Sequence, residues 1–246
     1  MSSGSRPPSS PPAGARQQAA RMREYERWLS SHAPSAIGFR WLMGSTGQLL
    51  TNGPALRLPT ALRLDPSTRL LDVGSGRGGL ARAIDEQLRP AVPPVAIDYS
   101  GTMLRLAARD GRHDGSRVGL VRATGTALPF ADARFTLVTC GHVAKHLDDR
   151  ELRALLGEIR RVLEPGGLAV LWEFGPSGNP RLDRWNTATV SLGVRQPRLR
   201  SSVTLQHHAL AAGFDLARDA NLRPFLAPPI PRASVLLGRP PEGWRE

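Results

Sequence analysis

Short apolar runs alternate with segments of helical periodicity over most of this chain, and this alternation limits the possible folds more than any other feature. The runs that we expect to form strands are residues 70–73, 95–97, 118–122, 135–139, 168–174, 214–218 and 233–237. Helical segments should cover residues 80–88, 102–108, 149–163 and 205–212. The alternation predicts an α/β fold with a doubly wound, seven-stranded and mostly parallel sheet, closed by an antiparallel pair. The carboxyl ends of its parallel strands should share one edge, where ligands bind.

The segments outside this alternation divide the chain into parts. Residues 1–20 are rich in Ser, Pro, Gly and Ala and have almost nothing to bury, so we expect a disordered tail. Residues 21–62 begin with apolar side chains at helical spacing and should form a helical cap before the sheet. Residues 63–240 should form the main domain, which a polar, Arg-bearing insertion interrupts at residues 175–202.

The net charge of +12 raises the question of a nucleic-acid partner. The basic residues are almost all arginines, spread along the chain with acids between them, and Lys145 is the only lysine. Such spacing is typical of a solvated surface, so a nucleic-acid partner is possible but not favoured.

The single cysteine, Cys140, excludes an internal disulfide and a cysteine-based zinc site. The sequence has neither an apolar run long enough to span a membrane nor the apolar core of a secretory signal. We therefore expect a cytoplasmic protein without a membrane partner.

A glycine-rich motif follows the first expected strand, in the run Leu70 to Gly79, which reads LLDVGSGRGG. Glycines allow positive φ angles and let a ligand lie against bare backbone, and the helix that follows offers unpaired N–H groups. Taken alone, Gly74, Gly76 and Gly79 also fit the pattern G-x-G-x-x-G of dinucleotide-binding proteins. The motif predicts a site for a small polar ligand and leaves its identity open.

Two carboxylates beside this motif narrow the choice of ligand. Asp72 lies two residues before Gly74, where it would crowd a pyrophosphate but could accept hydrogen bonds from an ammonium group. Asp98 ends the next strand, 24 positions after Gly74, where a carboxylate could bind the hydroxyls of a ribose. A ribose site at Asp98 fits a dinucleotide and a cationic ligand equally, whereas Asp72 favours the cationic ligand.

Four segments, in their order and spacing, carry a resemblance to a known family: LLDVGSGRG, AIDYSGTML, ALPFADARFTLVTC and RVLEPGGLAVLWEF. Over about residues 65–175 the chain resembles the class I methyltransferases that depend on S-adenosylmethionine (SAM), especially those that act on small molecules. The resemblance implies a Rossmann-like fold, SAM as the cofactor and transfer of a methyl group to an oxygen, nitrogen or carbon atom of a small molecule. It leaves a monomer and a homodimer equally open.

The resemblance also assigns roles to residues of the cofactor site. Gly74, Ser75 and Gly76 should lie under the methionyl part of SAM with Asp72 nearby, Asp98 should bind the ribose, and Tyr99 and Met103 should flank the adenine. Gly125 and Thr126 belong to the adenine loop. Its first residue, Thr124, stands where the family usually has an aspartate, so this position can still accept a hydrogen bond but lacks the charge.

The residues after the fourth strand should face the reacting atoms. Cys140 should lie near the sulfonium, and His142 is the candidate general base for an acceptor that carries a hydroxyl. His142 and His146 also form an H-x-x-x-H pair, but no acidic third ligand stands nearby, so we expect no metal. The cap at residues 21–62 and the insertion at residues 175–202 should cover the substrate.

Three other functions stay open. An RNA methyltransferase would suit the charge, although Cys-Gly-His-Val stands where an Asn/Asp-Pro-Pro-Tyr motif would support a base-nitrogen target. A SAM-binding protein without catalysis would suit Thr124. An NAD-dependent oxidoreductase would suit the glycine motif alone but not Asp72 and the later segments.

Overall fold

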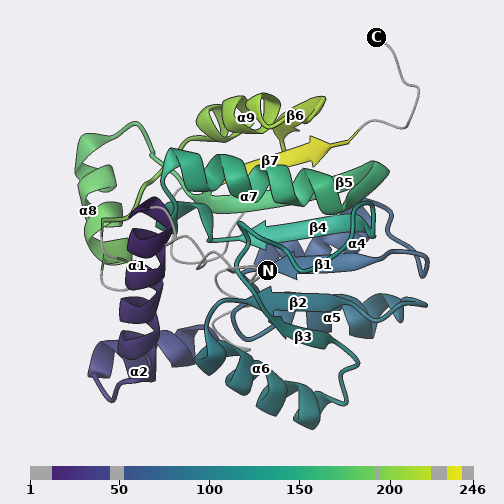
Figure 1. The fold of residues 1–246 in the computed structure, drawn as a ribbon, viewed down its shortest axis with the longest axis horizontal. Helices are drawn as coiled ribbons and strands as arrows, with labels where there is room; N and C mark the ends of the chain where they lie inside the picture. The colour runs from purple at the N-terminus through teal and green to yellow at the C-terminus, as the bar shows by residue number, and fades with distance from the viewer. Residues whose placement is uncertain (1–12, 45–52, 192–193, 195, 223–231, 240–246) are drawn as a thin grey trace, which may run out of the picture.

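The computed structural model describes residues 13–44, 53–191, 194, 196–222 and 232–239 of the chain. A seven-stranded sheet with the order β3-β2-β1-β4-β5-β7-β6 forms its centre (Figure 1). The strands are β1 (Leu70–Val73), β2 (Val95–Asp98), β3 (Gly119–Arg122), β4 (Phe135–Gly141), β5 (Leu163–Phe174), β6 (Leu216–Asp219) and β7 (Arg232–Gly238). The pairs among β1 to β5 are parallel, and β7 runs antiparallel to both β5 and β6. The predicted fold class, including the antiparallel closing pair, is confirmed.

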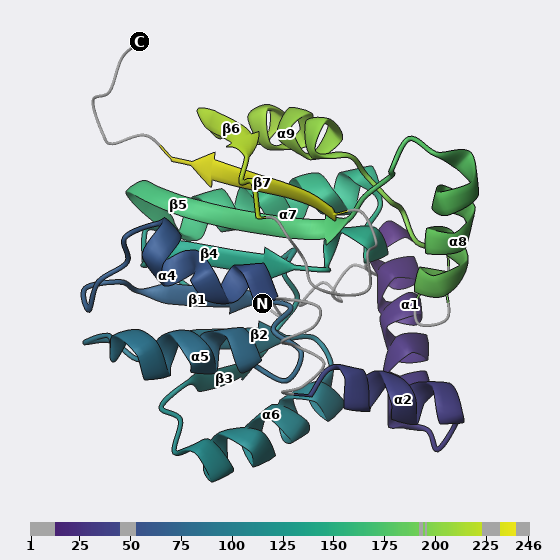
Figure 2. The ribbon, with the colours of Figure 1, turned by 180° about the vertical axis from the view of Figure 1, so that it is seen from behind.

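Helices cover both faces of the sheet (Figures 1 and 2). They are α1 (Ala13–Ser30), α2 (Pro34–Leu42), the 3₁₀ helix η1 (Gly53–Arg57), α4 (Leu58–Ala61), α5 (Gly79–Leu88), α6 (Gly101–Asp114), the 3₁₀ helix η2 (Ala144–His146), α7 (Asp149–Val162), α8 (Pro180–Ser191) and α9 (Ser202–Ala211). Side chains of α7 and α9 form one apolar core with the sheet, and those of η1, α4 and α5 form a second core on the other face. No helix within these described residues is long and apolar enough to span a membrane.

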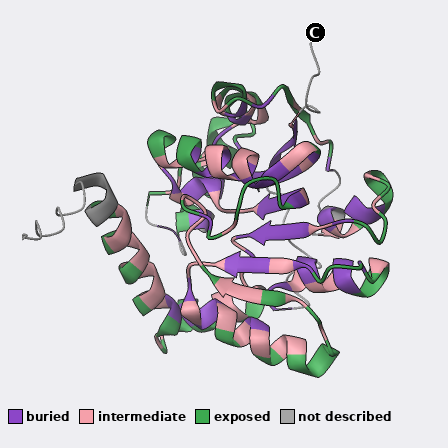
Figure 3. Cartoon of the chain, turned by 45° about the vertical axis from the view of Figure 1, so that its right-hand side comes forward, coloured by how far each residue is buried: buried purple, intermediate pink, exposed green. Residues whose placement is uncertain are grey.

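Helix α7 shows how local sequence builds one of these layers. Its N-cap Asp148 accepts a hydrogen bond from the backbone of Glu151, and Glu151 bonds back to the backbone of Asp148, which forms a capping box. Leu152, Leu155 and Ile159 then follow at helical spacing and are buried against the sheet. The central strands beneath it are buried along their length (Figure 3).

The expectation of a disordered tail over residues 1–20 is wrong for residues 13–20, because α1 begins at Ala13. The Ser and Pro residues that suggested disorder lie in residues 1–12, outside the described residues, whereas residues 13–20 are mostly Ala, Gln and Arg, which favour helix. Gln18 also makes a long contact across the structure, where its Nε2 donates to Thr126 Oγ1 at 3.4 Å. The start of α1 therefore belongs to the folded body.

One helix and one strand boundary also differ from the sequence prediction. The insertion at residues 175–202 contains a full helix, α8, which the sequence pattern did not indicate. Strand β5 begins at Leu163 instead of Leu168, because the Pro-Gly-Gly turn is an irregularity inside the strand, where the register with β4 shifts. Gly166 takes a φ of +82° there, which glycine adopts without strain.

Candidate functional site

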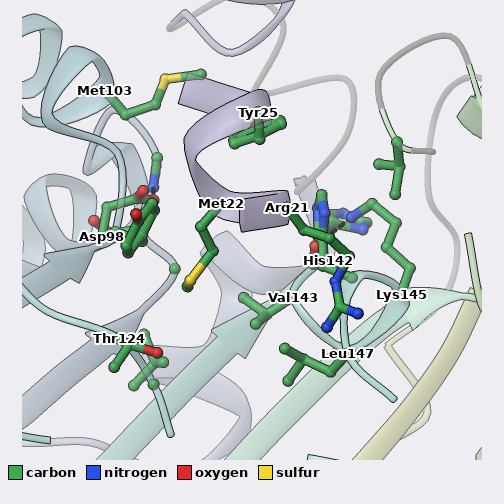
Figure 4. A pocket seen from close by; sticks show the side chains of 18 of the residues that line it. Arg21, Met22, Tyr25, Asp98, Met103, Thr124, His142, Val143, Lys145 and Leu147 are labelled. Carbon is green, nitrogen blue, oxygen red and sulfur yellow. Dashed lines mark hydrogen bonds between the residues drawn. The ribbon is translucent and has the colours of Figure 1, made fainter. Parts of the chain in front are cut away.

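A cavity of about 400 Å³ lies at the carboxyl edge of the sheet, where β1, β2 and β4 end. Its walls come from the turn after β1, the end of β2, the loop after β3, the loop after β4 and helix α1. Ten of the predicted site residues line it: Gly74, Ser75, Gly76, Asp98, Tyr99, Met103, Thr124, Gly125, Thr126 and His142. Asp98 and Thr124 lie on one side of the cavity and His142 on the other, with Met22 between them (Figure 4).

The glycine turn brings two loops close together. A β-carbon at Gly74 would lie 2.2 Å from Cγ2 of Val143, so only glycine lets the loop after β4 approach the turn this closely. The backbone N–H of Ser75 donates to the carbonyl of Ile97 at 2.9 Å and ties the turn to β2. At Gly76 a β-carbon would meet open space, but the φ of +56° still disfavours any other residue.

Asp98 is a carboxylate at the end of β2 that faces the cavity. Its Oδ2 accepts a hydrogen bond from the N–H of Gly76 and its Oδ1 one from the N–H of Ser100, both at 2.8 Å. Loss of solvent around the carboxylate raises its pKa to about 6, although the two N–H donors oppose the rise. The turn and the end of β2 are thus held in one arrangement by a single side chain.

Asp72 and Cys140, which the sequence placed at the ligand, do not line the cavity. Side chains alternate along a strand, so Asp72 shares a face of the sheet with Leu70 and points away from the cavity, where it accepts a hydrogen bond from Thr139 Oγ1 at 2.8 Å. Burial raises the pKa of Asp72 to about 7. Cys140 lies in the core beneath α7, and burial raises the pKa of its thiol.

Helix α1 closes the cavity through contacts that the sequence did not predict. The carboxylate of Glu26 accepts hydrogen bonds from the N–H of Thr102 at 2.9 Å, from its hydroxyl at 2.8 Å and from the hydroxyl of Ser100. These donors lie at the start of α6, where backbone N–H groups have no helical partner. The pKa of Glu26 is lowered, because these hydrogen bonds outweigh its loss of solvent. Arg21, five residues before Glu26 in the same helix, pairs with Glu151 of α7 at 2.5 Å.

The opposite end of the cavity holds a charged cluster. Glu173 near the end of β5 lies with its Oε1 at 3.5 Å from His142 Nδ1 and at 3.6 Å from Lys145 Nζ. Sequence reasoning had singled out His142 but neither of its charged neighbours. Their signal was weak, because Glu173 lies inside a largely apolar strand and Lys145 lies inside a short 3₁₀ turn.

His146 is buried beside the aromatic ring of Tyr25. Burial lowers the pKa of His146 to about 3, with the positive charge of Lys145 as the next cause, and its ring packs edge-on against Tyr25 at 5.5 Å between centroids. Among the residues with a described position, no three His, Cys, Asp or Glu side chains gather into a group that could hold a metal ion.

Comparisons with known proteins identify the domain. Residues 70–167 match the family described as a methyltransferase domain. The demethylmenaquinone methyltransferase of Thermus thermophilus is 37% identical over 134 residues, which cover 52% of this chain and 59% of that protein. The YcgJ protein of Bacillus subtilis superposes with a TM-score of 0.58 at 25% identity and covers 69% of this chain and 70% of that one. The chain carries a class I SAM-dependent methyltransferase domain.

A plant relative extends beyond the matched part of this methyltransferase domain. The 24-methylenesterol C-methyltransferase 2 of Oryza sativa is 31% identical over 180 residues, which cover 71% of this chain and 48% of that protein. The chain spans about half the length of the first curated relatives that it matches. The likeness therefore identifies the methyltransferase domain and does not extend to the activity of the whole chain.

The polar groups of the cavity fit the cofactor of this methyltransferase family. Ser75 Oγ is buried at the glycine turn and has no hydrogen-bond partner among the residues that the structure describes, so a ligand can supply one. Gly76 leaves open space beside it. Asp98 presents a carboxylate with acceptor capacity beyond its two backbone donors.

Proposed function

We propose that this chain transfers a methyl group from SAM to a small-molecule acceptor. The observation that carries this proposal is the shape of the site: one cavity joins the glycine turn and Asp98 at one end to His142 and Lys145 at the other. Bound SAM would supply an electrophilic methyl group. The chain's own part is to hold the acceptor in line with that group and exclude water, since orientation alone accounts for much of such a rate enhancement.

The residues around the cavity support roles in cofactor binding. Asp98 would bind the ribose hydroxyls, Ser75 and Gly76 would contact the methionyl part, and Tyr99 with Met103 would flank the adenine. Thr124 would offer its hydroxyl where the family has a carboxylate, and this hydroxyl already lies 3.0 Å from that of Thr126. Asp72 would act behind the turn, because it does not reach the cavity wall.

The acceptor end favours a largely apolar small molecule over RNA. Met22, Tyr25 and Trp28 of α1 and Phe39 of α2 line the cavity, so the helical cap places apolar and aromatic side chains over it. A cover of this kind supports a small acceptor over a polyanion such as RNA. Two relatives are named for methylation of demethylmenaquinone and of 24-methylenesterol, and we extend to this chain a ring-bearing acceptor of similarly low polarity.

A methyl-transfer assay tests the proposal. The purified chain is incubated with SAM labelled in its methyl group and with hydroxylated naphthalenes, naphthoquinols and sterols, and the label is followed into organic extracts. We expect label in at least one ring compound and release of S-adenosylhomocysteine in equal amount. Tight binding of SAM without transfer to any acceptor of this set, or labelling of RNA only, would contradict it.

A further inference from the structure

Glu173 is a buried carboxylate that forms the centre of the charged cluster. Its side chain is 1% exposed. One oxygen, Oε2, accepts the backbone N–H of Lys145 at 2.9 Å, and Oε1 accepts the N–H of Phe174 at 2.7 Å. The same Oε1 lies 3.5 Å from His142 Nδ1 and 3.6 Å from Lys145 Nζ. The carboxylate thus contacts two cavity-lining groups that could carry a positive charge, His142 and Lys145.

The cluster keeps Glu173 ionised although it is buried. Burial alone would raise the pKa of a carboxyl group, but the charge of Lys145 and the contacts with His142 hold the pKa of Glu173 down at about 2. An ionised carboxylate that is buried persists in a fold only when it is paired and hydrogen-bonded. At neutral pH, Glu173 is therefore a fixed negative charge beside the Nδ1 edge of His142.

The backbone of His142 is held in an arrangement that needs support. His142 has a φ of +60°, which residues other than glycine rarely adopt and which is common at functional sites. Its N–H donates to the carbonyl of Trp172 at 2.8 Å, and its carbonyl accepts the ammonium of Lys145. The ring lies 4.6 Å from that of Phe174, measured between centroids. Ring and backbone are therefore both held in place by β5 and η2.

We propose that Glu173 is a positioning residue, which holds His142 with its proton on Nδ1 and so leaves Nε2 as the atom that accepts a proton from the substrate. This inference rests on the proposed function and adds to it a group that does not touch the acceptor. A negative charge beside Nδ1 favours the tautomer that donates there, and it stabilises the imidazolium once a second proton arrives. Contacts of this length often shorten when ligands bind.

The proton transfer balances for an acceptor that carries a hydroxyl. The hydroxyl proton passes to Nε2 of His142, and the oxygen forms a bond to the methyl carbon of the sulfonium donor. The carbon–sulfur bond breaks with its electron pair on sulfur, which gives a methyl ether and S-adenosylhomocysteine. His142 then carries one positive charge beside Glu173 and returns its proton to solvent after the product leaves.

Other charged groups around His142 act on it as well. Lys145 of η2 opposes its protonation, and His146 of the same turn is held neutral by burial. From α1, Arg21 and Glu24 line the same cavity with opposite charges. Glu173 Oε1 lies 3.5 Å from Nδ1 of this imidazole, so we expect its removal to change the protonation of His142 directly.

The test reads the histidine itself and needs no acceptor. Nitrogen NMR of protein labelled with ¹⁵N-histidine reports which ring nitrogen carries the proton, and His142→Gln assigns the signal. We expect the neutral imidazole of His142 in the wild type to carry its proton on Nδ1. In Glu173→Gln the Nε2–H tautomer should dominate, and the pH of half-protonation should fall because the anion beside the imidazolium is gone.

Two further variants keep the result decisive. Glu164→Gln removes a carboxylate from the same strand, beside Arg69 and outside the cavity lining, and should leave the His142 signal unchanged. Glu173→Gln combined with Lys145→Met removes both buried charges, so it avoids an unpaired lysine if the single variant does not fold, and it should show the same change of tautomer. An Nε2–H tautomer in the wild type, or no change in either Glu173 variant, would overturn the proposal.

A titration of the same samples with S-adenosylhomocysteine separates this inference from the proposed function. Tight binding together with an Nε2–H tautomer overturns the role of Glu173 alone. Failure to bind contradicts the proposed function, whatever the tautomer of His142.

Discussion

At the scale of single residues, three carboxylates near the cavity have three different environments. Asp98 faces the cavity and keeps acceptor capacity for a ligand. Asp72 lies behind the turn with one hydroxyl donor, and Glu173 is surrounded by positive or protonatable groups. Their pKa values follow these surroundings, raised for the first two and lowered for Glu173. Of the three, Glu173 is therefore the carboxylate that stays ionised down to the lowest pH.

Asp72 gives a prediction about stability and pH. Its pKa of about 7 in the folded chain lies above the ordinary value of 3.8, so the folded state binds the proton more tightly than the unfolded state. Stability must then fall as pH rises through this interval, because the unfolded chain releases its proton first. Asp72→Asn stays neutral and can still accept the Thr139 hydroxyl.

Urea unfolding of both proteins at pH 5 and pH 8 measures this effect. Between these two pH values the wild type should lose about 2–3 kcal/mol of unfolding free energy relative to Asp72→Asn, because about two pH units separate pH 5 from the folded pKa of about 7 and each contributes about 1.4 kcal/mol. Parallel changes in the two proteins would mean that Asp72 is not desolvated as described.

At the scale of elements, the sheet could be predicted from the sequence, because its strands are short apolar runs separated by amphipathic helices. Helix α8 could not, because only some of its residues, such as Asn186 and Val190, are buried, and its composition is that of a polar loop. The start of α1 was misplaced because its first turns owe their order to helix-forming residues and to contacts with distant segments, such as that of Gln18. Periodicity within one segment does not report contacts of this kind.

Glu26 tests whether α1 is held to the domain as the structure indicates. Glu26→Ala leaves the N–H and the hydroxyl of Thr102, at the start of α6, without their acceptor, and loss of such a cap typically costs about 1 kcal/mol. We expect hydrogen exchange at the backbone amides of α1 to become several-fold faster, with the amides of β4 unchanged. Glu86→Ala, on the exposed side of α5, is the matched control and should leave both regions as in the wild type. Equal protection of α1 in Glu26→Ala and the control would contradict this docking.

At the scale of the whole molecule, the site depends on parts of the chain that are far apart in sequence. The cofactor end could be predicted from local motifs, since the glycine turn and Asp98 lie in consecutive strand–helix units. The acceptor end could not, because α1, η2 and the end of β5 meet only in the folded chain. His142 is the exception, because it closely follows a predicted strand, whereas the contacts of Glu173 and Glu26 with the site join segments far apart in sequence.

Titration calorimetry with S-adenosylhomocysteine tests the central claim that the cavity is a SAM site. We expect the wild type to bind this ligand and not NAD. Asp98→Ala should bind it about 1–3 kcal/mol more weakly, because the ligand's hydroxyls lose a charged partner. Glu86→Ala should bind as the wild type does. Tight binding of NAD without binding of S-adenosylhomocysteine, or an affinity unchanged by Asp98→Ala, would contradict the account.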